Sequence, residues 1–140
     1  MARDGFNLAG LMSLLGKLFG VRPDVIPTHI ETRDDFARLV LQSDVPVIVD
    51  VWSETCAPCK QLVPVLIKVA TKYEGKLRVA ELSTQAEPRL LAELAVRATP
   101  TILVFEGGVE IGRMAGYRPA GWFDEMIATE FPDLNGNTKA

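Results

Sequence analysis

Cysteine and histidine are scarce in this sequence, which has two cysteines and a single histidine among its 140 residues. Two cysteines are too few for a small scaffold held together by several disulfides. A structural zinc site normally takes four protein ligands, and Cys56, Cys59 and the distant His29 do not complete a common cysteine–histidine set. The two cysteines are therefore more informative as a pair than as members of a larger ligand set.

Long runs of one charge and long apolar runs are missing as well. The formal net charge is −3 without an extended basic run, so a nucleic-acid-binding surface is disfavoured. The longest apolar stretches are far shorter than the roughly 20 residues needed to span a bilayer, so no transmembrane span is expected. Apolar residues make up 48% of the chain, and its length suits one globular domain rather than a disordered chain.

The N-terminal segment 7–20 has apolar residues at helical spacing. Six of them would share one face of an amphipathic helix: Leu8, Leu11, Met12, Leu15, Leu18 and Phe19. An export signal is disfavoured because Lys17 interrupts the apolar run and no clear cleavage site follows. We expect this helix to pack on its own domain or on a second copy, or to dock on a partner. Docking on a membrane surface is disfavoured because the polar face carries little positive charge.

The domain is expected to cover residues 28–130, between an N-terminal extension with a linker (1–27) and a frayed C-terminal tail (131–140). Strands are expected where apolar and β-branched residues cluster, at 28–31, 46–52, 77–82, 101–105 and 109–115. Helices are expected after an N-cap at Thr32, from the cysteine pair to about Tyr73, and at 87–94 and 119–129. Early β-α-β alternation and a closing hairpin at Gly107 and Gly108 predict an α/β fold, with a mixed central sheet flanked by helices on both faces.

The segment Cys56-Ala57-Pro58-Cys59 lies where an apolar strand is expected to end and a helix to begin. The first turn of a helix presents unpaired amides and the positive end of the helix dipole, and both stabilise a thiolate. A thiolate attacks disulfides, and two intervening residues let the second sulfur attack the first in turn. The alternatives are a structural disulfide, a zinc site or two inert buried thiols. Closing so tight a loop stabilises little, and a C-x-x-C beside a β-α-β pattern favours redox chemistry.

Asp50 is the only charged residue in the apolar segment 46–52. Burial raises the pKa of a carboxyl group because it disfavours the charged form. A carboxyl tuned toward neutral pH suits proton exchange with a thiol. The alternative is an acid at the end of a strand that water reaches.

The segments VDVWSETCAPCKQLVPVL and ATPTILVF resemble two landmarks of the thioredoxin family, and the resemblance covers residues 28–129. It implies a thioredoxin-like fold with Cys56 as the exposed nucleophile and Cys59 as the more buried resolving thiol. Asp50 corresponds to the family's buried acid, which accepts a proton from Cys59. The resemblance also implies a set of substrate-binding positions: Trp52, Ala57, Pro58, Thr99, Pro100 and Gly116. Pro100 corresponds to the family's cis-proline, which leaves the Thr99 backbone to pair with an extended substrate strand.

Three residues depart from the family pattern. Thr55 stands where a second tryptophan is usual, Ala57 replaces a glycine, and Glu81 takes the approximate place of a lysine beside the buried acid. If Glu81 lies near Asp50, like charges raise the pKa of Asp50 further. These changes argue against exchange with a standard thioredoxin reductase and leave room for a dedicated partner.

The leading functional prediction is a cytoplasmic protein-disulfide reductase. It would take electrons from a reductase and pass them to oxidised protein disulfides. No bound cofactor is expected, because the cysteine pair itself carries two electrons. The alternatives are a thiol oxidant or isomerase in an exported compartment, which would have a more oxidising potential, and a redox-independent binding or chaperone module with the same fold.

Overall fold

The computed structural model describes residues 8–20 and 23–135. Residues 1–7, the first two residues of the expected linker (21–22) and the end of the expected tail (136–140) lie outside the described residues. Within the described ranges, no helix is both long enough and apolar enough to cross a membrane.

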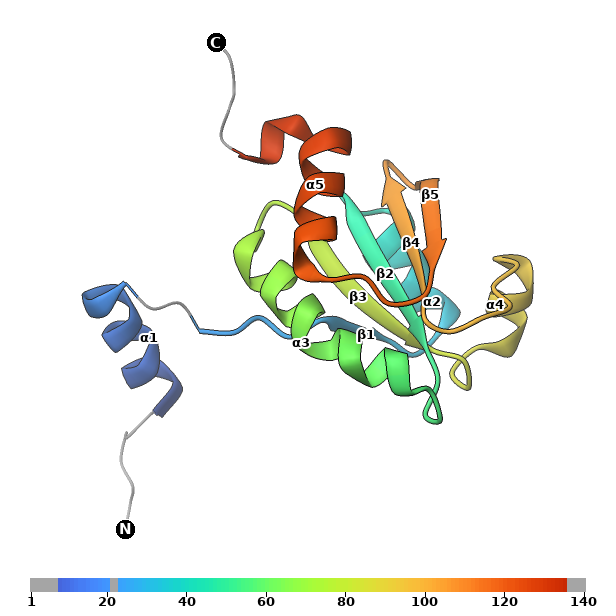
Figure 1. Ribbon diagram of the computed structural model, residues 1–140, viewed down its shortest axis with the longest axis horizontal. Helices are drawn as coiled ribbons and strands as arrows, with labels where there is room; N and C mark the ends of the chain where they lie inside the picture. Colours follow the sequence, from blue (N-terminus) through green and yellow to red (C-terminus); the bar gives the residue numbers. More distant parts are fainter. Residues whose placement is uncertain (1–7, 21–22, 136–140) are drawn as a thin grey trace.

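A five-stranded mixed sheet forms the centre of the domain (Figure 1). In the spatial order β1-β3-β2-β4-β5, its strands are β1 (Thr28–Ile30), β3 (Arg78–Ser83), β2 (Val47–Trp52), β4 (Thr101–Glu106) and β5 (Val109–Ala115). β3 pairs in parallel with β1 and β2, whereas β4 pairs antiparallel with β2 and β5. The mixed sheet, parallel in its first part and closed by a hairpin, confirms the predicted fold class.

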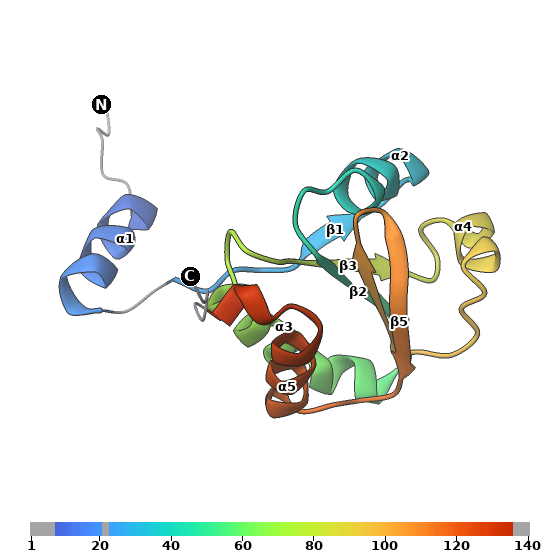
Figure 2. The same ribbon diagram turned by 90° about the horizontal axis from the view of Figure 1, so that it is seen from above.

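Helices cover both faces of this sheet (Figure 2). On one face lie α3 (Ala57–Lys72) and α5 (Ala120–Glu130). On the other lie α2 (Arg33–Phe36), its π-helical continuation η1 (Ala37–Leu41) and α4 (Pro88–Glu93). Each face has its own apolar core, so each of these helices is held by the apolar side chains that it buries against the sheet.

Strand β2 lies in the middle of the sheet and is buried on both faces. Val47, Val49 and Val51 pack toward α2 and α4, while Ile48 packs toward α3 and α5. Side chains alternate along a strand, so Asp50 lies on the same face as Ile48, the face that α3 covers. The continuous apolar run predicts this double burial.

Turn and cap residues set the ends of the elements. The Thr32 hydroxyl accepts a hydrogen bond from the Asp35 N–H, and the Asp35 carboxylate accepts one from the Thr32 N–H, which confirms the predicted N-cap. In the β4–β5 turn, Gly107 and Gly108 have φ angles of 59° and 81°. A Cβ atom on Gly108 would lie 2.6 Å from the Leu41 carbonyl oxygen, so this position needs glycine for space as well as for conformation.

The predicted N-terminal helix is present as α1 (Leu8–Phe19), which stands apart from the sheet in both views (Figures 1 and 2). Its large apolar side chains are exposed: Leu8, Leu11, Met12, Leu14, Leu15, Leu18 and Phe19. The structure therefore does not have the expected packing of this face on its own domain. Docking of α1 on a second copy or a partner stays a prediction.

The described part of the expected linker, residues 23–27, is attached to the domain. The Val25 N–H donates a hydrogen bond to Thr71 Oγ1 of α3 at 2.8 Å, and the Val25 side chain packs against the core beneath α3 and α5. Pro27 is buried. The chain is therefore fixed to the domain before β1 begins.

The expectation of a frayed tail is wrong for residues 131–135. Phe131 is 4% exposed and belongs to the same core as Phe123 and Ile127. A single 3-10 turn, η2 (Pro132–Asn135), follows it, and Leu134 packs against this core. Pro132 disfavours helical geometry at the residue before it, which fits the end of α5 at Glu130. The aromatic ring of Phe131 nevertheless buries enough apolar surface to hold the segment in place.

Phe131→Ala should lower the free energy of unfolding by about 3–5 kcal/mol, because it removes a buried aromatic ring and leaves a cavity. Urea denaturation measures this change. Thr129→Ala, at an exposed position of α5, is the control and should change stability little. Equal stability of the two variants would show that Phe131 is not part of the core.

Candidate functional site

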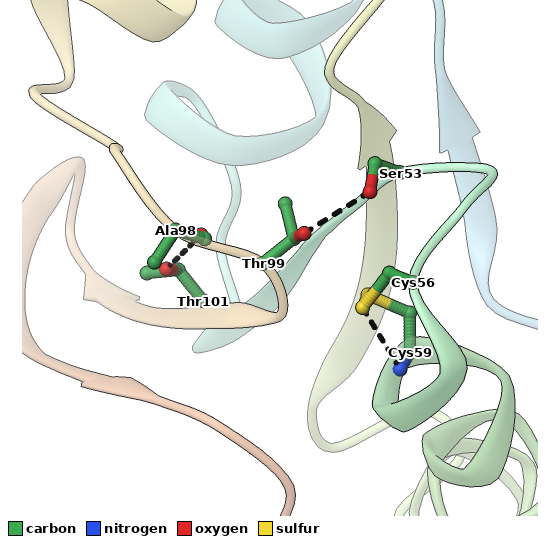
Figure 3. The surroundings of a disulfide bond; sticks show 6 residues. All are labelled: Ser53, Cys56, Cys59, Ala98, Thr99 and Thr101. Atoms are coloured by element: carbon green, nitrogen blue, oxygen red, sulfur yellow. Dashed lines mark hydrogen bonds between the residues drawn. A yellow bond between two sulfur atoms is a disulfide. The ribbon is translucent and has the colours of Figure 1, made fainter.

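Cys56 and Cys59 form a disulfide at the start of α3, shortly after the end of β2 (Figure 3). Their Cα atoms are 5.2 Å apart. Pro58 lies in the first turn of α3, where backbone N–H groups have no acceptor within the helix, so the missing N–H of proline costs no hydrogen bond. The buried strand before the pair and the amphipathic helix after it fix the position of both sulfurs.

The Cys56 sulfur takes the place of a helix cap. Cys56 is the N-cap residue of the 16-residue helix α3, and its Sγ accepts a hydrogen bond from the Cys59 N–H at 3.1 Å. The sulfur therefore meets unpaired amides and the positive end of the helix dipole. Both stabilise negative charge on Cys56 once the disulfide is opened.

The two sulfurs differ less in accessibility than the resemblance implies. Cys56 is 8% exposed and Cys59 3% exposed, so Cys56 is the more accessible but is still largely covered. In the disulfide, the Cys56 sulfur is bonded to the Cys59 sulfur and accepts a hydrogen bond from the Cys59 N–H. Ala57 and Pro58, between the cysteines, are exposed.

Asp50 is buried beneath this disulfide-bearing end of α3. It is 2% exposed, and within the described residues its Oδ1 has no hydrogen-bond partner. Burial raises the pKa of Asp50 to about 7, and the nearby charge of Glu81 contributes to the rise. The acid therefore exchanges its proton near neutral pH.

Asp50 and Cys59 line the same cavity, which has a volume of about 370 Å³. This is much larger than the roughly 30 Å³ that one molecule occupies in liquid water. The cavity wall is mostly apolar and includes Trp52, Val63 and Leu66. Beside Cys59, the wall contains five side chains with ionisable groups: His29, Asp50, Glu54, Lys60 and Glu81.

Glu81 and His29 continue from Asp50 across the sheet. The register places Asp50 of β2 beside Glu81 of β3, and Glu81 beside His29 of β1. His29 Nδ1 lies 2.6 Å from Glu81 Oε1. Partial burial raises the pKa of Glu81, while the charge of His29 opposes the rise. Sequence reasoning considers His29 only as a zinc ligand, since strand register cannot be read along the chain.

The loop before β4 also belongs to the site (Figure 3). The Thr99–Pro100 peptide bond is cis, and the Gly116 N–H donates to the Pro100 carbonyl at 2.8 Å. Ser53 Oγ and Thr99 Oγ1 lie 3.1 Å apart and share a hydrogen bond, which joins this loop to the end of β2. Sequence reasoning misses Ser53, and a hydroxyl at the end of an apolar strand is the only signal that points to it.

The predicted substrate-binding residues fall in two groups. Trp52, Ala57 and Pro58 belong to the end of β2 and the start of α3, and Trp52 is partly buried in the cavity wall. Thr99, Pro100 and Gly116 come from the loop before β4 and the end of the hairpin. Among residues 8–20 and 23–135, no three His, Cys, Asp or Glu side chains are grouped as a metal site requires.

Comparison with known proteins extends the resemblance. The sequence profile of the family described as "Thioredoxin" matches residues 27–129. "Thioredoxin 1" of Nostoc sp. is 38% identical over 88 residues, covering 63% of this chain and 82% of that protein. "Thioredoxin" of Synechocystis sp. is 36% identical over 84 residues, covering 60% and 78%. "Thioredoxin" of Rickettsia felis is 38% identical over 100 residues, covering 69% and 95%.

Glu81→Gln should lower the pKa of Asp50 from about 7, because it removes the like charge beside this carboxyl. The pKa should stay above that of an ordinary aspartate, since burial is the larger cause and remains. Carboxyl-selective NMR titration measures it. Glu54→Gln removes another carboxylate of the cavity wall and should leave Asp50 unchanged. An unchanged pKa in Glu81→Gln would reject the repulsion between the two acids.

The raised pKa of Asp50 also predicts that stability falls as pH rises from about 4 to about 7. In this window the unfolded chain loses the Asp50 proton while the folded protein keeps it. The Asp50→Asn side chain cannot titrate. This variant should therefore lack the part of the pH-dependent loss in unfolding free energy that comes from Asp50, on the order of 4 kcal/mol. Urea denaturation between pH 4 and pH 9 measures the unfolding free energy of the wild type and of Asp50→Asn. If the two free energies change with pH in parallel, the prediction is contradicted.

Proposed function

The chain belongs to the thioredoxin family, and we propose that it reduces disulfides in other proteins through Cys56 and Cys59. Membership and the close cysteine pair make it a thiol–disulfide oxidoreductase. The observation that carries the proposed mechanism is the Cys56 sulfur at the N-terminus of α3, with Cys59 and a buried acid on one cavity.

In the first step, the Cys56 thiolate attacks one sulfur of the substrate disulfide. A bond forms between Cys56 and that sulfur, the substrate disulfide breaks, and the other substrate sulfur leaves as a thiolate. The amides at the start of α3 support this step because they stabilise the attacking thiolate.

In the second step, Cys59 resolves the mixed disulfide. Its thiol proton passes to the Asp50 carboxylate, and the Cys59 thiolate attacks the Cys56 sulfur. The Cys56–Cys59 disulfide forms, and the bound substrate sulfur leaves as a thiolate that takes a proton from water. The substrate gains the two electrons that the cysteine pair loses. The cavity shared by Asp50 and Cys59 supports this transfer.

The substrate would lie along the loop that contains Thr99 and Pro100. Within the described part of the chain, the Thr99 backbone makes no hydrogen bond, so it is free to pair with an extended substrate segment. The hydrogen bond between Ser53 and Thr99 holds this loop beside the end of β2. Trp52, Ala57, Pro58 and Gly116 would complete the binding surface.

A dithiol reductase would supply the two electrons that reduce the Cys56–Cys59 disulfide back to two thiols. No further cofactor is needed, because the cysteine pair stores both electrons. We place the reaction in the cytoplasm, where a reducing thiol pool keeps such pairs reduced. Thr55 and Ala57 are exposed next to the disulfide and differ from the usual residues there, so a donor with its own matching surface is expected.

Cys59→Ser should trap substrate proteins as mixed disulfides, because Cys56 still attacks but nothing resolves the product. Non-reducing electrophoresis of mixtures with oxidised insulin detects the adduct. The matched control, Cys56→Ser, should trap far less because it lacks the nucleophile at the helix N-terminus. If a variant lacking both thiols still reduced insulin at the wild-type rate, the assignment of this activity to Cys56 and Cys59 would be wrong.

The reduction potential separates the two directions of the chemistry. A reduction potential of about −270 mV, the value of thioredoxin itself, supports a reductase. A potential of about −120 mV supports a thiol oxidant. Equilibration with a dithiothreitol or glutathione series measures it. Partner capture that persists without both thiols would instead support the binding-module alternative.

A further inference from the structure

We propose that Glu81 and His29 form a proton path between Asp50 and solvent, with His29 as the proton carrier at its outer end. The inference rests on the proposed function, because it concerns the proton that Asp50 takes from Cys59. It assigns a role to two residues that lie outside the cysteine motif.

The geometry consists of three titratable side chains in one row across three neighbouring strands. Asp50, Glu81 and His29 are register partners on β2, β3 and β1. Register partners in parallel strands point to the same face of the sheet. All three side chains therefore lie on the face covered by α3, and all three line the cavity that includes Cys59.

Exposure increases steadily along this row. Asp50 is 2% exposed, the Glu81 side chain 18%, and the His29 side chain 65%. The outer step is a direct contact, with His29 Nδ1 2.6 Å from Glu81 Oε1. The inner step, from Asp50 to Glu81, crosses a cavity wide enough to admit water. The row thus joins a buried acid to the protein surface.

The remaining charged groups on the cavity do not offer the same connection. Glu54 lies in the loop before α3 and Lys60 in its first turn, and both are exposed. Neither is a register partner of Asp50, and neither contributes to the shift of its pKa. Within the described residues, the unpartnered Oδ1 of Asp50 is left to the cavity and its water.

The path moves one proton without changing any covalent bond. Asp50 becomes protonated when Cys59 resolves the mixed disulfide. It passes a proton through cavity water to the Glu81 carboxylate, which passes one to the His29 ring across their contact at Nδ1. A proton then leaves the other ring nitrogen for solvent, so one proton enters at Asp50 and one leaves at His29. Imidazole suits this position because its two ring nitrogens let it take a proton on one side and release one on the other.

His29→Gln tests the path because glutamine can still donate a hydrogen bond to Glu81 but cannot relay a proton. With insulin as substrate and dithiothreitol as electron donor, we expect several-fold slower turnover in dilute buffer near pH 7. Added imidazole should restore the rate, since it replaces the lost proton carrier. Wild-type turnover should be insensitive to imidazole. Glu54→Gln is the matched control and should behave like the wild type.

Two results would overturn the path. One is a His29→Gln rate equal to wild type at every buffer concentration, and the other is a slower rate that imidazole does not restore, which marks a purely structural role. A wild-type protein that fails to reduce insulin would instead overturn the proposed function. The two failures are therefore distinguishable in the same assay.

Discussion

The hydrogen bond from the Cys59 N–H, in the first turn of α3, to the Cys56 sulfur is the constraint around which the site is organised. A cap normally satisfies unpaired amides with an oxygen, and here a sulfur takes that place. The amide that this sulfur caps can also stabilise a thiolate, so one interaction serves both local folding and reactivity. The central strand β2 and the apolar face of α3 matter for function because they hold this helix terminus in position.

The second constraint is the burial of an acid beneath the redox pair. Asp50 lies in a strand covered on both faces and is most stable there when it carries a proton. Such a residue lowers stability at higher pH and does not improve packing. Its position on the cavity wall shared with Cys59 supports the role proposed for it, a proton acceptor whose pKa of about 7 suits exchange near neutral pH.

Local signals in the sequence predict most of the fold and part of the site. The apolar run 46–52, the Thr32 cap and the paired glycines of the hairpin each have a short-range physical meaning, and the structure has all three features. Features that depend on distant residues could not be predicted. The contact of His29 with Glu81 needs strand register, and the burial of Phe131 needs a core built from α3 and α5. The exposed face of α1 is another such case, because periodicity identifies an apolar face but not its partner.

Glu81 and His29 are best understood together. A lysine beside a buried acid would favour its ionised form, whereas Glu81 favours the protonated form and holds the proton more firmly at neutral pH. A proton held in this way needs a route out if the acid is to accept another in the next cycle. His29 contacts the same glutamate from the solvent side, where it both offsets the negative charge and reaches water. The substitution that makes Asp50 harder to deprotonate thus occurs together with a residue suited to carry its proton away.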